Sequence, residues 1–181
     1  MFPYLLDSTL FLFVGLAVFF DIRERKIPNW LVLLALVAGF LINAVEGQFS
    51  FLKSLYGLGL GIGIFFIPFA LGLLGAGDVK FLGAIGAILG ASFIPRIAFY
   101  SVVAGGILAL CSVVVNGFQF QNITTTIRDI QLFIMSRGKI APETVQTRTG
   151  RGVNTIPYGV AIGLGTLLAF YGDPQGYWAG F

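Results

Sequence analysis

The chain has 181 residues, of which 57% are hydrophobic and 10% are charged, and its formal net charge is +3. Soluble domains carry about 25% charged residues, so this composition excludes a soluble globular domain and indicates an integral membrane protein. The sequence contains no His and one Cys, which excludes Ser-His-Asp triads, Cys-His pairs, His-ligated zinc and an intrachain disulfide.

Six apolar runs are candidate membrane spans, because a spanning helix needs about 20 mostly apolar residues, with a range of about 17–25. They are Tyr4–Phe20, Trp30–Val45, Phe51–Leu74, Val79–Phe93, Ile97–Val115 and Ile156–Tyr171. We expect an all-α, polytopic membrane protein with six transmembrane helices, forming one membrane-embedded domain over residues 1–181. The first run has no basic segment before it and no small-residue cleavage site after it, so we expect a retained helix.

Local signals predict where some of these helices begin and end. Asn29 can cap the second helix, and Pro28 blocks helical continuation from the preceding segment. The fourth run is shorter than the hydrocarbon core of about 30 Å at about 1.5 Å per residue, and we expect it to end at Pro95. Either Asp78, which precedes this run, is recessed below the membrane surface or the bilayer is thinner there. Cys111 lies in the fifth run, where we expect a small buried apolar side chain.

Glycines at i,i+4 spacing indicate close helix packing within lipid, because small residues let two backbones approach. The pairs are Gly57 with Gly61, Gly59 with Gly63, and Gly159 with Gly163. A nucleotide-binding glycine loop is excluded, because no GxGxxG follows a strand here.

Lys and Arg are concentrated around three of the connections between the runs, and only Lys53 and Arg96 fall on the other side of the membrane in this arrangement. The basic loops contain Arg23, Arg25, Lys26, Lys80, Arg128, Arg137, Lys139, Arg148 and Arg151. A basic excess marks the cytoplasmic side, so we expect these loops in the cytoplasm and both termini outside it, in the inner membrane. Membrane topology explains the basic residues better than nucleic-acid binding does, since they are not interleaved with aromatic residues.

The fifth and sixth runs are separated by a polar cytoplasmic loop over residues 116–154. Apolar residues recur in it at spacings of three and four, namely Phe120, Ile123, Ile127, Ile130 and Ile134. This pattern predicts an amphipathic helix over residues 122–136 that lies on the membrane face and ends at Gly138. The helix could be a tether between two spans or a docking surface for substrate, and the sequence favours neither.

Two carboxylates stand at the ends of apolar runs. Asp21 follows the first run, and Asp78 follows the third in Gly75-Ala76-Gly77-Asp78. Ionisable groups beside membrane segments are expensive, so each is a functional-site hypothesis. Gly75 and Gly77 free the local backbone dihedrals and let another backbone approach Asp78. Both aspartates fall at predicted cytoplasmic helix ends, so they can meet across the bundle.

Two neighbouring carboxylates share a proton and can perform acid–base catalysis. The ionised one takes a proton from an attacking water, and the protonated one donates to the carbonyl oxygen and then to the leaving amine, as in aspartic proteases. The alternative is a small proton-coupled transporter that uses the carboxylates as a relay. Transport predicts charges near mid-membrane and internal repeats, and the sequence has neither. A scaffold without catalytic activity is a third possibility.

Three segments carry a resemblance to type IV prepilin peptidases, which are GxGD membrane aspartic proteases. They are Asp21-x-Arg23 with Ile27-Pro28-Asn29, then Gly75-Ala76-Gly77-Asp78-Val79-Lys80, and finally Ile156-Pro157-Tyr158-Gly159-Val160-Ala161-Ile162-Gly163. The chain resembles the short form found in tight-adherence pilus systems. Presenilin-like proteases share the GxGD element but have more spans than this length allows, and archaeal preflagellin peptidases are less similar.

The resemblance implies that Asp21 and Asp78 are the catalytic pair and that no metal or cofactor is used. It implies prepilin or pseudopilin substrates, cleaved at the cytoplasmic face between a short basic leader and an apolar helix. Longer members have an N-terminal domain with paired cysteines, associated with N-methylation; this sequence lacks it, so we expect no methyltransferase activity.

The other residues of these segments are expected to bind substrate or shape the site. They are Gly75, Gly77, Lys80, Arg23, Pro28, Asn29, Pro157, Tyr158 and Gly159. Arg23 and Lys80 also have a simpler interpretation as topology signals, and residues at i,i+2 do not face the aspartates on a helix.

Overall fold

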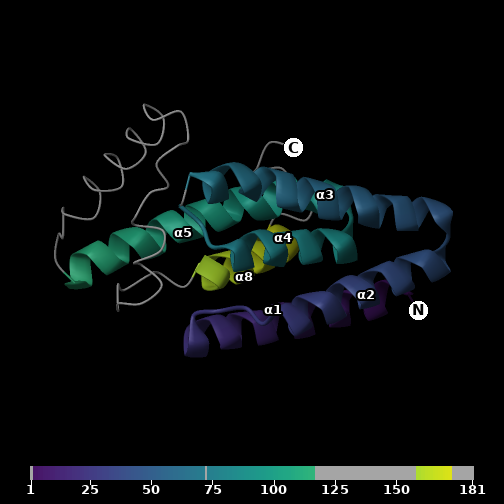
Figure 1. Cartoon of the computed structure of the whole chain (residues 1–181), viewed down its shortest axis with the longest axis horizontal. Coiled ribbons are helices and arrows are strands. Elements are labelled where there is room, and N and C mark those ends of the chain that lie inside the picture. Colours follow the sequence, from purple (N-terminus) through teal and green to yellow (C-terminus); the bar gives the residue numbers. More distant parts are fainter. Residues whose placement is uncertain (1, 72, 117–157, 173–181) are drawn as a thin grey trace, which may run out of the picture. The chain divides into compact units, whose positions relative to one another are not determined.

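The computed structural model describes residues 2–71, 73–116 and 158–172, and these form helices without any strand (Figure 1). The elements are α1 (Phe2–Glu24), α2 (Asn29–Glu46), α3 (Gln48–Ala70), α4 (Ala76–Leu89), a 3-10 turn η1 (Ala91–Phe93), α5 (Ile94–Asn116), α8 (Tyr158–Leu167) and a π-helical turn η2 (Leu168–Gly172). All six apolar runs therefore contain helix, and the all-α prediction is confirmed for the described residues.

Four helical segments in the described part of the chain are long and apolar enough to cross a membrane. They are Tyr4–Glu24, Asn29–Glu46, Gln48–Ala70 and Ala91–Cys111. The helix α4 has 14 residues, and the last apolar helical stretch, Tyr158–Gly172, is also short. The chain is thus a helical membrane protein whose described residues contain four candidate spans and two shorter apolar helices, and the prediction of six spans is not confirmed. The predicted amphipathic helix over 122–136 lies outside the described residues.

The chain divides into two compact units, of which the first comprises Met1–Gly106 and Pro157–Phe181 and the second Ile107–Ile156. Both aspartates lie in the first unit. Within it, α4 contacts α1, α2, α3 and α8. Almost every residue of α4 from Val79 to Ile88 is buried, so this short helix forms the centre of the packing.

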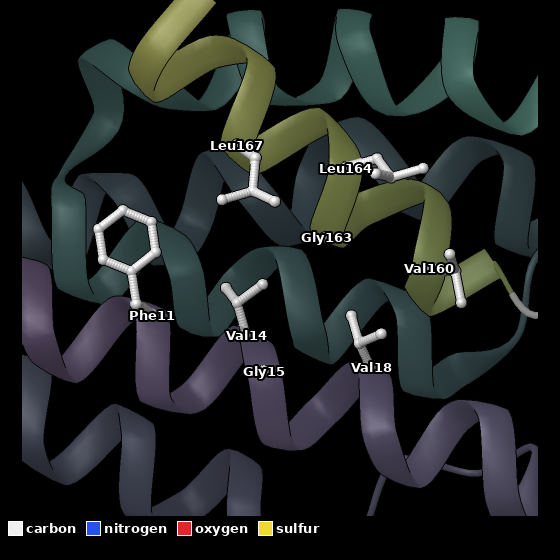
Figure 2. A pocket seen from close by; sticks show the side chains of 8 residues that line it. All are labelled: Phe11, Val14, Gly15, Val18, Val160, Gly163, Leu164 and Leu167. Atoms are coloured by element: carbon white, nitrogen blue, oxygen red, sulfur yellow. The ribbon is translucent and has the colours of Figure 1, made fainter.

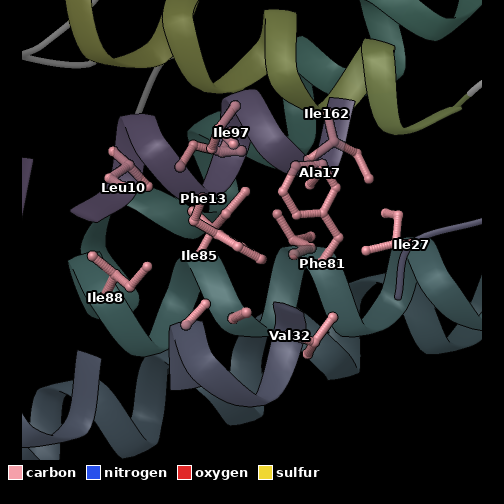
Figure 3. Close-up of a cluster of buried hydrophobic side chains, with 14 of the residues drawn as sticks. Leu10, Phe13, Ala17, Ile27, Val32, Phe81, Ile85, Ile88, Ile97 and Ile162 are labelled. Carbon is pink, nitrogen blue, oxygen red and sulfur yellow. The ribbon is translucent and has the colours of Figure 1, made fainter. Parts of the chain in front are cut away.

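The core around α4 is made of aliphatic and aromatic side chains from several helices (Figure 3). Phe13 of α1 meets Phe81 of α4 edge to face, with ring centroids 5.2 Å apart. The outer faces of the long helices carry large apolar side chains as well, such as Leu33, Leu41 and Phe66. A soluble protein would bury such side chains, whereas a membrane protein presents them to lipid.

The glycine pair Gly57 and Gly61 lets α3 lie directly against α4, as the spacing predicted. A Cβ atom on Gly57 would collide with the backbone of Gly86, and one on Gly61 would lie 2.7 Å from the Leu82 carbonyl oxygen. Among the described residues, nothing lies within 4 Å of a Cβ position on Gly59 or Gly63, so the prediction is wrong for that pair in this part of the chain.

The carbonyl end of α4 is capped by polar side chains of its neighbours. Asn43 Nδ2 of α2 donates to the carbonyl oxygens of Ala87 and Ile88, at 3.3 and 3.2 Å, and Ser54 Oγ of α3 donates to Ala87 as well. Unpaired helix-end carbonyls are costly away from water, and these bonds satisfy them.

Three predicted boundaries differ from the structure. The fourth helix ends at Leu89 because Gly90 has φ 83°, and Pro95 instead lies in the first turn of α5, where its missing N–H costs nothing. Asn29 is the first residue of α2, and the cap position belongs to Pro28, whose carbonyl oxygen accepts from the Leu31 and Val32 amides. The third helix ends at Ala70, four residues before Leu74.

Cys111 is exposed, which contradicts the prediction that it is buried. A small apolar side chain on a membrane-length helix can face lipid at no cost, so its apolar character does not require a place inside the protein.

Candidate active site

Asp21 lies in the last turn of α1, and the chain after it is fixed by an unusual helix end. Arg25, the first residue beyond α1, has φ 53°, and its N–H donates to the Asp21 carbonyl oxygen at 2.9 Å. This is the αL cap that glycine normally provides, and a residue with a Cβ adopts it at a cost of roughly 1–2 kcal/mol. The cap keeps the positive charge of Arg25 close enough to act on the Asp21 carboxylate. Sequence reasoning missed this role of Arg25.

The Asp21 side chain is buried, with 6% of its surface exposed, and its Oδ2 accepts no hydrogen bond from the part of the chain that the structure describes. Buried polar atoms nearly always have a hydrogen-bond partner, so a buried oxygen without one indicates a functional group. The first turn of α8 adjoins this carboxylate, and the backbone N–H groups of Gly159 and Val160 approach it. A helix N-terminus favours a negative charge at this place.

Gly159 leaves the space that Asp21 occupies. A Cβ atom at this position would lie 2.6 Å from Asp21 Oδ2 and 2.9 Å from its Cγ. Such distances are far below van der Waals contact, so any side chain at Gly159 would displace the carboxylate.

Asp78 lies in the first turn of α4, where Gly75 is the N-cap. The Gly75 N–H donates to Asp78 Oδ2 at 3.1 Å, which holds the carboxylate against the helix N-terminus. Burial raises the pKa of Asp78 from 3.8 to about 6; the Gly75 hydrogen bond opposes this rise, and the negative charge of Asp21 adds to it. The two carboxylates therefore interact electrostatically at one end of the helix packing.

The two glycines before Asp78 provide space, and neither needs the backbone freedom that was expected of them. Among the described glycines only Gly47 and Gly90 have positive φ. A Cβ on Gly75 would lie 3.3 Å from Asp78 Oδ2, which is tight, whereas one on Gly77 would make ordinary contact with Ile27 at 3.8 Å.

The segment between α1 and α2 follows Asp21 and contacts the first turn of α4, which contains Asp78. Ile27 is buried and packs on Gly77, next to Asp78. Lys80 Nζ donates to Asn29 Oδ1 at 3.0 Å, so the start of α2 is tied to the first turn of α4. Sequence reasoning named Lys80 and Asn29 separately and missed that they are partners.

The remaining candidate residues lie at different distances from the pair. Tyr158, the first residue of α8, packs edge to face on Phe65 and touches Gly105, and the charge of Asp78 acts on it. Arg23 is exposed, and the cation that acts on Asp21 is Arg25. Pro157 lies outside the described residues.

Apolar helices with two interacting carboxylates at one end define a helical membrane protein with a candidate acid–base site. Residues 8–110 match the family model of the type IV leader peptidase family. The match covers more than half of the chain and includes both aspartates, so the chain belongs to this family and is a peptidase by family. No curated protein and no solved structure matches the chain.

Proposed function

We propose that the protein is a membrane aspartic endopeptidase that removes the short basic leader from type IV prepilins or pseudopilins, with Asp21 and Asp78 as the catalytic pair. One observation carries the proposal: in a member of the leader peptidase family, a buried carboxylate, one oxygen of which accepts no hydrogen bond from the described residues, acts on a second carboxylate whose pKa is about 6.

The two environments support different roles for the two acids. Asp78 keeps its proton up to a pH of about 6, which suits a general acid near neutral pH. Burial desolvates the Asp21 carboxylate and disfavours its charge, while the N-terminal amides of α8 and the Arg25 cation oppose this effect; we assign Asp21 the role of general base because it is the acid with these anion-stabilising neighbours.

The reaction then needs only water and these two groups. Asp21 accepts a proton from the water as its oxygen attacks the scissile carbonyl carbon, and Asp78 donates its proton to the carbonyl oxygen. Collapse of the tetrahedral gem-diol breaks the C–N bond: the proton held by Asp21 passes to the leaving amine, and Asp78 takes back a proton from the hydroxyl group that becomes the product carbonyl. Each cycle consumes one water and returns the pair to a state with one shared proton.

The cytoplasmic side is supported by the charges around the pair. Arg23, Arg25 and Lys26 follow Asp21, and Lys80 follows Asp78. Basic residues mark the cytoplasmic side, so the site lies where a leader on the cytoplasmic end of a prepilin helix enters it, and both chain termini lie outside the cytoplasm.

Co-expression with a candidate prepilin tests the proposal, with leader removal followed by the change in prepilin mass. Asp21→Asn and Asp78→Asn should each abolish leader removal, because they keep the shape of the acids and remove their ionisation. Glu24→Gln, which changes an exposed carboxyl group at the same end of α1, should process normally. Normal processing by either aspartate variant would show that these residues are not the catalytic pair.

A further inference from the structure

A groove on the surface of the first unit lies between α1 and α8 (Figure 2). Its volume is about 230 Å³, and all of its lining residues are apolar. The side of α1 contributes Phe11, Gly15 and Val18, and α8 contributes Val160, Leu164 and Leu167. An apolar lining without hydrogen-bonding groups fits an apolar occupant.

The lining of the groove comes within one helical turn of the candidate catalytic carboxylate. Val18 precedes Asp21 by one helical turn on α1, and Val160 directly follows Gly159, which adjoins Asp21 Oδ2. The lining residues of α1 extend from Phe11 to Val18, which is a length of about 10 Å, or two helical turns, at about 1.5 Å per residue.

Small residues let another helix approach the floor of this groove. Gly15 is exposed, and nothing lies within 4 Å of a Cβ position on it. Leu164 and Leu167 are 43% and 41% exposed at the groove rim. Helices associate in lipid where glycine allows close backbone contact between two apolar surfaces.

We infer that this groove binds the first turns of the apolar substrate helix, on the mature side of the scissile bond. The inference rests on the proposed function, which supplies a substrate with an apolar helix directly after the cleavage site. Such a helix accounts both for the apolar lining and for the position of the groove near Asp21. A helix seated there would hold the preceding peptide bond at the carboxylate pair, and the leader would extend beyond Asp21.

Gly15→Leu tests the inference, with Gly59→Leu as the matched control. Both glycines are exposed, lie inside long helices and have free space around a Cβ position. Gly15→Leu should fill the groove and lower kcat/KM for prepilin cleavage at least about tenfold through a higher KM, because one methylene too many in an apolar pocket changes this ratio by about 10–200-fold. Gly59→Leu should cleave like the unmodified protein. Equal kcat/KM for the two variants would overturn the groove assignment.

Photo-crosslinking provides a readout that does not depend on cleavage. A photoreactive amino acid at Leu164 should crosslink to the apolar helix of the prepilin, whereas one at Leu60, which is 38% exposed on α3, should not. Crosslinks from Leu164 only to lipid or to a second copy of the chain would overturn the inference. If the unmodified protein fails to remove the leader, the proposed peptidase function fails, and the crosslink alone then decides whether the groove binds the helix.

Discussion

Asp78→Asn should stabilise the protein at alkaline pH while it abolishes cleavage. Burial raises the pKa of Asp78 from 3.8 to about 6, so the folded state binds a proton more tightly than the unfolded state does. The folded state therefore loses stability as the pH rises from about 4 to about 6, and the loss is complete above that range. At about 1.4 kcal/mol for each unit of pKa, the loss at pH 8 is about 3 kcal/mol. Asparagine never ionises, so the variant avoids this loss.

Thermal unfolding of the purified protein in detergent micelles, at pH 8 and at pH 4, measures the effect. We expect the midpoint of Asp78→Asn to lie roughly 6–12 °C above that of the unmodified protein at pH 8, because 1 kcal/mol moves the midpoint of a domain of this size by about 2–4 °C. The difference should nearly vanish at pH 4. The control is Glu46→Gln, which replaces an exposed carboxyl group in the last turn of α2. Equal midpoints at pH 8, or an equal gain at both pH values, would refute the reasoning.

Three further predictions follow from the contacts described above. First, kcat/KM for leader removal should fall about tenfold per pH unit above a pH of about 6, because Asp78 loses its proton there. Initial rates measured between pH 5 and pH 8 will check this, and a flat pH profile would exclude Asp78 as the general acid. Second, Gly159→Ala should lower cleavage about 100-fold, since its methyl group displaces the Asp21 carboxylate, whereas Gly106→Ala, with free space around its Cβ, should cleave normally in the same assay. Third, Gly57→Ala should lower the unfolding free energy by about 1–3 kcal/mol, because its methyl group forces α3 away from α4. Gly59→Ala should raise the unfolding free energy by up to about 1 kcal/mol, because alanine favours the helix more than glycine does. Thermal midpoints of the two variants will measure both effects.

The helices were predictable from the sequence because long apolar runs leave few alternatives for a backbone in lipid. Which helices contact one another was not predictable. The pairs Gly57/Gly61 and Gly59/Gly63 have the same spacing, but an offset of two residues turns a side chain by about 200° around a helix. The position of α4 decides which pair becomes an interface, and no property of α3 alone contains that information.

The candidate site likewise has features that were predictable from the sequence and features that were not. The charge distribution, which depends only on composition and chain order, predicted that Asp21 and Asp78 lie on the same side of the membrane, and the two carboxylates do interact electrostatically. The contact of Gly159 with Asp21 depends on how α8 packs against α1, and the bond between Lys80 and Asn29 depends on how α2 packs against α4. The left-handed conformation of Arg25 was also unforeseeable, since glycine or asparagine is the usual residue at such a helix end.

The hydrogen bonds at the carbonyl end of α4 have a consequence for the depth of Asp78 in the membrane. Asn43 and Ser54 bind the C-terminal end of α4 to the adjacent helices, and Asp78 lies in the first turn, at the opposite end. The length of α4 therefore determines how far Asp78 lies from these hydrogen bonds. Adding or removing one turn would raise or sink the acid by about 5.4 Å relative to the lipid headgroups. Under the proposed function, the depth at which the leader is cleaved therefore depends on the length of α4.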